Sequence, residues 1–449
     1  MRSSLVFSDA TSRSLHEVLQ ASPFVERAAF LLCTEVRTDR SCKLIVKQVV
    51  PVRPGDYLRQ HAAGMSLASA AYTSVAKIAR DTGSSIIFVH SHPSGALYFS
   101  DQDDREEPKL IEFFKARVPG RTHGALVVCD GCVVGRIYTP EAADLDVIAE
   151  WGAHWKVHAG ASVGKQDVFD RSIRAIGRDG QALLRQLVIG VVGAGGTGSA
   201  IAQMLARLGV GTLRLFDEDK LEDSNVPRVL GAAMSQVGQA KVRVLEEHLR
   251  SIGLGTIVEA VEGSICRQDV AAMLRDCDVI FSCVDKEMPR SILMAHHRHY
   301  LTPVIDLGVK IEASQQSIKE VWGRITTMTP GSPCLFCRGR ISAEGLRLEA
   351  MRLDERSAQI RQGYAPELDE PAPAVVAYTS AVASMAAAEF LARLFLPGAR
   401  KSLGDESLMR LDLGTVRSNS GTMRANCICA NDESFAAGDI SPHLGLSWG

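Results

Sequence analysis

The chain lacks a strong excess of charge, a long apolar run and an even set of cysteines. Its 50 basic and 52 acidic residues give a net charge of −2, which leaves no electrostatic basis for binding nucleic acid or an anionic membrane. No stretch approaches the roughly 18–20 apolar residues of a membrane span, and the opening MRSSLVFSDATSRS lacks the apolar core of a signal peptide. The 11 scattered cysteines argue against a disulfide framework. We therefore expect a cytoplasmic protein with reduced or metal-bound thiols.

The most informative stretch begins at Leu187 and runs LVIGVVGAGGTGSAIAQMLARLGVGTLRLFDEDK. The apolar run 187–192 is typical of a buried strand, and glycines follow it at G-x-G-x-x-G spacing. Residues 199–208 then predict a helix, and 212–216 predict a second strand. In such a β-α-β unit the backbone N–H groups at the helix N-terminus can meet phosphates. The glycine turn alone does not separate NAD from ATP.

Polar residues beyond the second strand favour ATP. A hydride-transfer site has no need of Arg228 and Lys241 aimed at a triphosphate, whereas an adenylating site does. The segments GAGGTGS, DED and SNVPR, together with Lys241, resemble the MoeB/ThiF-like adenylating enzymes, which have the fold of ubiquitin-activating enzymes. The resemblance covers about residues 169–429, over half of the chain.

This resemblance implies a Rossmann-like α/β domain with a mostly parallel sheet, and ATP and Mg²⁺ as cofactors. It implies nucleotide contacts from Gly193, Gly195, Gly196, Gly198, Asp217, Asp219, Asn225, Arg228 and Lys241. Asp285, after a predicted strand at 278–282, matches the family's Mg²⁺ ligand, and one carboxylate plus phosphate oxygens and water suits Mg²⁺. Arg171, at the start of the family's first helix, matches an arginine that reaches the nucleotide of the neighbouring subunit, which implies a homodimer.

A second motif follows a short apolar strand at 86–89. Residues two apart in a strand share a face, so His90 and His92 can both reach one metal ion. Asp103, beyond the next loop, can add a carboxylate oxygen. Two histidines and one carboxylate leave a fourth tetrahedral position for water, which is the arrangement of a catalytic zinc site.

His90-Ser-His92-Pro, followed by Ser100-x-x-Asp103, resembles the JAMM (MPN/JAB) metalloprotease motif, and the resemblance covers about residues 1–140. It implies an α/β protease domain with Glu26, on an early predicted strand, as the general base; Glu35, at the far end of that strand, is the alternative. Ser100 would donate a hydrogen bond to the oxyanion. The implied reaction is hydrolysis of an amide or isopeptide bond after the C-terminus of a ubiquitin-like protein.

Two cysteine pairs stand far apart in the sequence: Cys334 with Cys337, and Cys427 with Cys429. The adenylating family often carries two CxxC pairs that bind a structural zinc, and four thiolates suit tetrahedral Zn²⁺. The second pair is a shorter CxC, so four unrelated thiols are the alternative.

We expect a protease domain at 1–145, a linker helix at 146–165, an adenylating domain at 166–432 and a loose tail at 433–449. The polar stretch 342–373 resembles the family's crossover loop. The resulting hypothesis is a bifunctional enzyme of a bacterial-type ubiquitin-like modification pathway, with a ubiquitin-like partner and a conjugating enzyme. Three alternatives stay open: a protease-dead scaffold, a sulfur-carrier activator with a trimming protease, and an NAD-dependent oxidoreductase with an accessory metal domain.

Overall fold

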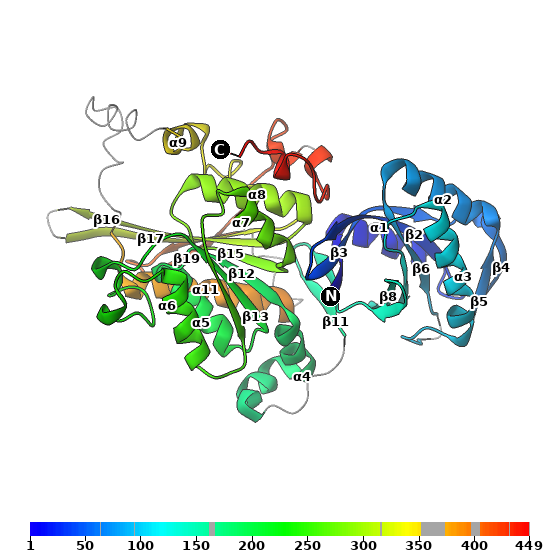
Figure 1. Cartoon of the computed structure of the whole chain (residues 1–449), viewed down its shortest axis with the longest axis horizontal. Helices are drawn as coiled ribbons and strands as arrows, with labels where there is room; N and C mark the ends of the chain where they lie inside the picture. Colours follow the sequence, from blue (N-terminus) through cyan, green and yellow to red (C-terminus); the bar gives the residue numbers. More distant parts are fainter. Residues whose placement is uncertain are drawn as a thin grey trace. The chain divides into compact units, whose positions relative to one another are not determined.

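The computed structural model describes residues 1–62, 64–93, 95–160, 167–314, 317–351, 373–396, 405–430 and 432–448. The chain forms two compact units (Figure 1). The N-terminal unit comprises Met1–Ser162 and Ala436–Asp439, and the C-terminal unit comprises Val163–Phe435 and Ile440–Gly449. Across the described residues, no helix has the length and apolarity to cross a bilayer. Most of the predicted crossover loop lies outside the described residues.

A nine-stranded sheet organises the N-terminal unit, in the order β11-β10-β1-β3-β2-β6-β7-β8-β9. The elements of this unit are β1 (Arg2–Ser8), α1 (Asp9–Leu19), β2 (Ala28–Arg37), β3 (Ser41–Pro51), β4 (Tyr57–His61), β5 (Gly64–Leu67), α2 (Ser69–Thr82), β6 (Ser85–Ser91), α3 (Asp101–Arg117), β7 (Gly124–Cys129), β8 (Cys132–Tyr138), β9 (Ala142–Asp144), β10 (Val147–Trp151) and β11 (Lys156–Ala159). Strands β4 and β5 form a separate two-stranded sheet.

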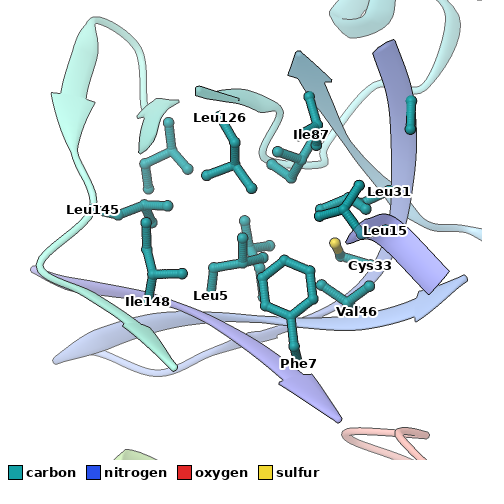
Figure 2. Packing of buried hydrophobic residues seen from close by; sticks show 14 of the residues in the cluster. Leu5, Phe7, Leu15, Leu31, Cys33, Val46, Ile87, Leu126, Leu145 and Ile148 are labelled. Atoms are coloured by element: carbon teal, nitrogen blue, oxygen red, sulfur yellow. The ribbon is translucent and has the colours of Figure 1, made fainter. Parts of the chain in front are cut away.

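The apolar side chains of β2 alternate between two cores, one on each face of the large sheet. Leu31 belongs to the core that includes Leu15 and Leu19 of α1. Its neighbour Phe30 belongs to the core formed with α2 and α3. There it meets Phe114 edge-on at 6.1 Å and the tilted ring of Phe88 at 5.6 Å. Figure 2 shows the first core, in which Leu15 lies close to Leu31, Cys33 and Val46. A strand that is apolar on both faces is thereby fully buried.

Two expectations, one for the linker and one for the end of the chain, are wrong. The predicted linker helix at 146–165 contains β10 and β11 instead, because β10 pairs in parallel with β1, with Ser4 opposite Val147. The tail at 433–449 is not loose, since Ala436, His443 and Leu444 are buried.

The C-terminal unit is built on an eight-stranded sheet in the order β14-β13-β12-β15-β16-β17-β18-β19. The elements of this unit are α4 (Asp170–Gln186), β12 (Val188–Val192), α5 (Gly196–Arg207), β13 (Thr212–Asp217), α6 (Lys241–Ser251), β14 (Ile257–Glu262), α7 (Gln268–Ala272), β15 (Val279–Ser282), α8 (Glu287–Tyr300), β16 (Val304–Ser314), β17 (Ser317–Met328), α9 (Ala343–Glu349), α11 (Val376–Phe395), β18 (Glu406–Arg410) and β19 (Thr415–Asn419).

The first five of these strands are parallel and the last three are antiparallel. Helices α5 and α11 lie on one face of the sheet, and α7 and α8 lie on the other (Figure 1). Buried Ala383 and Ala386 let α11 approach closely, and Phe390 meets Phe281 of β15 at 5.8 Å. The strand order reverses between β12 and β15. In a doubly wound sheet, ligands bind at the carboxyl ends of the strands beside that reversal.

Candidate functional sites

The β6–α3 region brings the predicted zinc ligands together. β6 ends beside the start of β2, with Ala28 opposite His90, and the His92 N–H continues the ladder by donating to Val128 of β7. The two histidine Nε2 atoms are 3.0 Å apart, and both rings are buried. His92 Nδ1 lies 2.8 Å from the carbonyl oxygen of Ala96, which directs its Nε2 toward His90.

Asp103 reaches the same point from the first turn of α3. Its carboxylate oxygens lie 3.2 Å from His90 Nε2 and 3.6 Å from His92 Nε2. Ser100 is the N-cap of α3: its Oγ accepts from the Asp103 N–H at 3.2 Å, and both its hydroxyl and its backbone N–H donate to Asp103 Oδ2 at 2.7 Å. This capping box fixes the Asp103 rotamer. The oxyanion role of Ser100 stays a prediction.

The three ligand atoms lie within 4.8 Å of one another. Although burial raises the pKa of Asp103, hydrogen bonds to both histidines and to Ser100 outweigh it and hold the pKa far below the usual range. The hydrogen bond to Asp103 raises the pKa of His92. A carboxylate and two imidazole nitrogens converging from a strand end and a helix start are a donor set that fits Zn²⁺.

Glu26 lies two residues before β2, not within a strand as expected, and it is buried. Its backbone is held by the β4 strand: the Glu26 N–H donates to the His61 carbonyl at 2.8 Å, and Gln60 Nε2 donates to the Glu26 carbonyl at 2.8 Å. Burial raises the pKa of the Glu26 carboxyl, against the opposing effect of His90 and His92. A carboxylate near the candidate zinc ligands with a raised pKa suits a proton shuttle.

Glu35, the alternative base, has a different environment. It lies seven residues beyond Ala28, which is about 23 Å along a strand, and its side chain is 4% exposed. Its carboxylate accepts from the Thr122 N–H at 2.7 Å, from Ser85 Oγ at 3.0 Å and from Arg37. Burial raises the pKa of Glu35, but these hydrogen bonds lower it overall. Glu35 therefore ties strands together at the far end of β2.

A cavity of about 700 Å³ opens beside the candidate zinc ligands. It is lined by Glu26, Ser100 and Asp103 at the ligand end, and by β5, α2 and α3 along its length. Its apolar lining is contributed by Met65, Leu67, Tyr72, Phe88, Leu110 and Phe113. Such a cavity has room for several residues of an extended chain.

The glycine turn of the C-terminal unit connects β12 to α5. Gly193 has φ +92°, a conformation that favours glycine. A Cβ at Gly198 would collide with the Gly193 carbonyl, so this glycine allows α5 to start close to the strand. A Cβ at Gly195 would meet nothing within 4 Å, and Gly196 is packed against the Arg228 carbonyl and Thr379. The Gly193 N–H donates to the Phe216 carbonyl, so the open space at this turn lies beside Gly195, where α5 starts and a phosphate could bind.

Asp217 and Asp219 lie at the carboxyl end of β13, next to this turn. The Asp217 carboxylate accepts from the Ala194 N–H at 2.6 Å and from the Asp219 N–H at 2.8 Å, and burial raises its pKa. It therefore holds the glycine turn in place. Lys241 Nζ, a predicted phosphate ligand, is paired with the Asp219 carboxylate, with 2.8 Å between Nζ and Oδ2.

The other predicted nucleotide residues belong to the same edge of the sheet. Asn225 is buried, and its Oδ1 accepts from the Glu222 N–H. Arg228 is half-buried and donates to the Ser224 carbonyl at 2.9 Å. Asp285 is exposed three residues after β15, beside the strand-order reversal. The glycine turn, Arg228, Lys241 and Asp285 thus lie at one edge of the sheet, and their contacts with a nucleotide stay a prediction.

Arg171 lies at the opposite end of the strands from the glycine turn. Phe169, two residues earlier, packs at Gly209, beyond the C-terminal end of α5. A helix of 12 residues is about 18 Å long, so Arg171 is separated from the glycine turn of its own chain by roughly the length of α5. Its side chain is exposed. Contact with the nucleotide of a second copy stays a prediction.

The four cysteines meet as predicted from the two distant pairs. Cys334 Sγ lies 3.4 Å from Cys427 Sγ, and Cys337 Sγ lies 3.5 Å from Cys429 Sγ. All four sulfur atoms lie within 4.8 Å of one another, and none is in a disulfide. A Zn–S distance of about 2.3 Å implies S···S edges of about 3.8 Å, so this donor set fits a structural Zn²⁺.

Comparison with known proteins assigns the C-terminal unit. A model of the ThiF family matches residues 169–429, more than half of the chain. The chain belongs to the ThiF family. A model described as prokaryotic homologues of the JAB domain matches residues 9–136. Both predicted resemblances are therefore confirmed, with a ThiF domain following a JAB-like domain.

Relatives of this ThiF-family chain include adenylyltransferases. Over 174 residues it is 30% identical to molybdopterin-synthase adenylyltransferase of Escherichia coli K12, covering 38% of this chain and 66% of the relative. Over 162 residues it is 30% identical to SAMP-activating enzyme E1 of Haloferax volcanii, covering 36% and 57%. The chain thus spans less than two thirds of these relatives. The microcin C7 biosynthetic enzyme MccB, in complex with N-formylated MccA, superposes with a TM-score of 0.49 at 16% identity, covering 59% of this chain and 75% of that one.

Sequence reasoning missed Arg290, on α8 of the ThiF domain. Arg290 donates to the Val284 carbonyl at 2.7 Å and to the Asp285 carbonyl at 3.3 Å. It also pairs with Asp306, which is fully buried and accepts from Ser282 and Arg324. Arg290 therefore holds the loop that carries the predicted Mg²⁺ ligand. The signal was weak, because an arginine five residues after Asp285 is typical of any exposed helix face.

Proposed function

We propose that the chain is a bifunctional enzyme of a bacterial-type ubiquitin-like modification pathway. The N-terminal unit would be a zinc-dependent peptidase or isopeptidase that matures or removes a ubiquitin-like protein. The ThiF domain would adenylate the C-terminal carboxylate of the same protein at the expense of ATP. The observation that supports this is the presence on one chain of the His90, His92 and Asp103 cluster and of a glycine turn with Arg228, Lys241 and Asp285 at one sheet edge.

In the peptidase reaction, His90, His92 and Asp103 would hold Zn²⁺. When bound, the ion acts as a Lewis acid and lowers the pKa of a coordinated water molecule to about 7. Glu26 would take a proton from the attacking water and pass it to the leaving amine, which its burial and raised pKa favour. The cavity beside Glu26 would hold the chain that is cut.

In the adenylation reaction, Asp285 would hold Mg²⁺ against the phosphates of ATP, and Asp217 would lie near the ribose. Binding of ATP would release Lys241 from Asp219 and turn Lys241 and Arg228 toward the phosphates. The carboxylate oxygen of the ubiquitin-like protein would attack the α-phosphorus, and the bond to pyrophosphate would break. The products are an acyl-adenylate and pyrophosphate. Arg171 from a second copy would support this step, so we propose a homodimer.

We propose that the reaction at this chain stops at the acyl-adenylate, which a conjugating enzyme or other partner nucleophile then attacks. Cys283 lies near Asp285, but burial strongly raises the pKa of its thiol. Burial also raises the pKa of Cys266. Cys334 and Cys337 belong to the four-cysteine cluster. A half-buried thiol with a raised pKa and a metal-bound thiolate are both poor acyl acceptors.

The decisive experiment measures both activities on the full-length protein. ATP–pyrophosphate exchange should depend on a ubiquitin-like protein and Mg²⁺, and a fusion extended beyond that protein's final glycine should be cut in a zinc-dependent reaction. Binding of NAD without pyrophosphate exchange would instead support an oxidoreductase. Exchange without cleavage would leave a scaffold in which the N-terminal unit only presents the partner.

The free thiols support a cytoplasmic location.

A second candidate is an activator of a sulfur carrier, with the peptidase trimming the carrier. It is favoured by the names of the relatives, which include a molybdopterin-synthase adenylyltransferase and an adenylyltransferase and sulfurtransferase. The two candidates share the acyl-adenylate and differ in the nucleophile that follows. Supplying the adenylated partner with a sulfide donor or with an amine-bearing protein, and identifying the product by mass, separates them.

A further inference from the structure

Arg136 of β8 contacts residues that precede and follow the candidate zinc ligand Asp103 in the sequence. Its guanidinium lies over the ring of Phe99 at 3.9 Å, and Phe99 immediately precedes the N-cap Ser100. Its Nη1 donates to Asp104, the residue after Asp103, at 2.7 Å. Arg136 therefore brackets the short segment that carries the ligand.

The same arginine is anchored one turn further along α3. Nε and Nη2 of Arg136 donate to the two carboxylate oxygens of Glu107 at 2.7 and 3.1 Å, and Tyr138 donates to the same carboxylate at 2.7 Å. The side chains of Arg136 and Glu107 are 14% and 3% exposed. A forked ion pair with so little exposure has a fixed geometry, which a single surface charge pair lacks.

The first turns of α3 need such an external support. Pro108 lies inside the helix and has no N–H, so the Asp104 carbonyl loses its helical partner. The segment from Ser100 to Glu107 is thus tied less firmly to the rest of α3 than an ordinary helix start. The contacts of Arg136 instead connect this segment to the large sheet, which also carries His90.

We propose that Arg136 is a positioning residue, which fixes Asp103 opposite His90 and His92 by clamping the first two turns of α3 to β8. The inference rests on the proposed zinc peptidase, since it assigns Asp103 as a ligand. Arg136 does not contact the ligand atoms and does not line the cavity, although its partner Glu107 does. Its effect is transmitted through Phe99, Asp104 and Glu107.

The test measures zinc affinity of the full-length protein by competition with a chelator, with thermal unfolding as the companion measurement. His90→Ala reports the zinc that remains on the four-cysteine cluster, which is subtracted. We expect Arg136→Gln to weaken the His90, His92 and Asp103 site by about tenfold or more, in the range found when residues that orient metal ligands are changed. Arg136→Lys, which keeps the charge and loses the fork, should lie between native and Arg136→Gln.

Two further variants keep the test decisive. Asp104→Asn changes a side chain that is 56% exposed, so it should fold, and it should weaken zinc binding by a smaller factor. Arg117→Gln is the matched control, because Arg117 also stacks on an α3 ring, at 5.3 Å from Phe113, but in the last turn of the helix. It should leave zinc affinity unchanged.

Native zinc affinity in folded Arg136→Lys and Asp104→Asn would overturn the proposal, even if Arg136→Gln unfolds more easily. Arg136 would then only stabilise the fold. Failure of the native protein to bind zinc outside the four-cysteine cluster is a different result. It would overturn the proposed peptidase itself.

Discussion

Replacing Glu26 by glutamine tests the proposed proton shuttle with little change in shape. The hydrogen bonds that hold this residue to β4 involve its backbone N–H and carbonyl, so Glu26→Gln keeps them. The zinc ligands are unchanged. The variant should therefore fold, keep its zinc and lose only the carboxylate that moves the proton.

The expected loss follows from that single function. A positioned general acid or base contributes about 10²–10⁴-fold, which is about 3–5 kcal/mol of activation free energy. We expect cleavage of an extended ubiquitin-like fusion to slow by that factor in kcat, with zinc content unchanged. Because burial raises the pKa of Glu26, native kcat/KM should fall as the pH drops through a value above that of an ordinary glutamate. Glu26→Gln should lack this acidic limb.

Glu35→Gln, within β2, is the matched control. It should cleave at the native rate but lose about 1–3 kcal/mol of stability, because the Thr122 N–H and Arg37 lose an ionised partner. The folded pKa of Glu35 is lowered, so its contribution to stability is present above the unfolded pKa of about 4.3 and is lost as the pH falls through the folded value. Native cleavage by Glu26→Gln, or loss of cleavage in Glu35→Gln, would refute the assignment.

The remaining predictions separate the two units. His92→Ala should lose one zinc and all cleavage while ATP–pyrophosphate exchange stays native. Loss of exchange would contradict the view that the two units catalyse their reactions independently. Cys337→Ser should release the other zinc and lower the thermal stability of the ThiF domain, with peptidase zinc retained, and an unchanged zinc count would argue for unrelated thiols. Enzyme incubated with ATP, Mg²⁺ and the modifier should yield only AMP-linked modifier. A covalent adduct that thiols cleave would show that a cysteine carries the acyl group. An adduct that resists thiols but is cleaved by hydroxylamine would indicate a serine ester, for example at Ser342.

The patterns that predicted the sites are those in which local backbone structure alone brings the side chains of nearby residues together. A histidine pair two apart at a strand end, and a serine three residues before an aspartate at a helix start, each place their side chains through local backbone structure alone. The glycine turn is local for the same reason. These groups were predictable from residues that lie within about one turn of each other.

The features that were missed depend on contacts between distant residues. β10 lies in the stretch predicted as a linker helix, yet its pairing partner is β1 at the start of the chain. Arg136 and Glu107 are 29 residues apart, and no pattern marks them as a pair. Arg290 and Asp306 are 16 apart and meet only because β16 lies next to β15. Long-range pairing of this kind has no signature in a single sequence.

The two proposed activities oppose each other if the modifier is already attached, since one breaks the bond that the other prepares. They act in series if the peptidase first exposes the carboxylate that the ThiF domain then adenylates. Both reactions meet the substrate at the same chemical group, the C-terminal carbonyl of the modifier's tail. A peptidase that releases this carboxylate would supply the ThiF domain on the same chain with its substrate. That order requires a modifier synthesised with residues beyond its final glycine, whereas a modifier that ends at that glycine leaves the peptidase only the removal of attached copies.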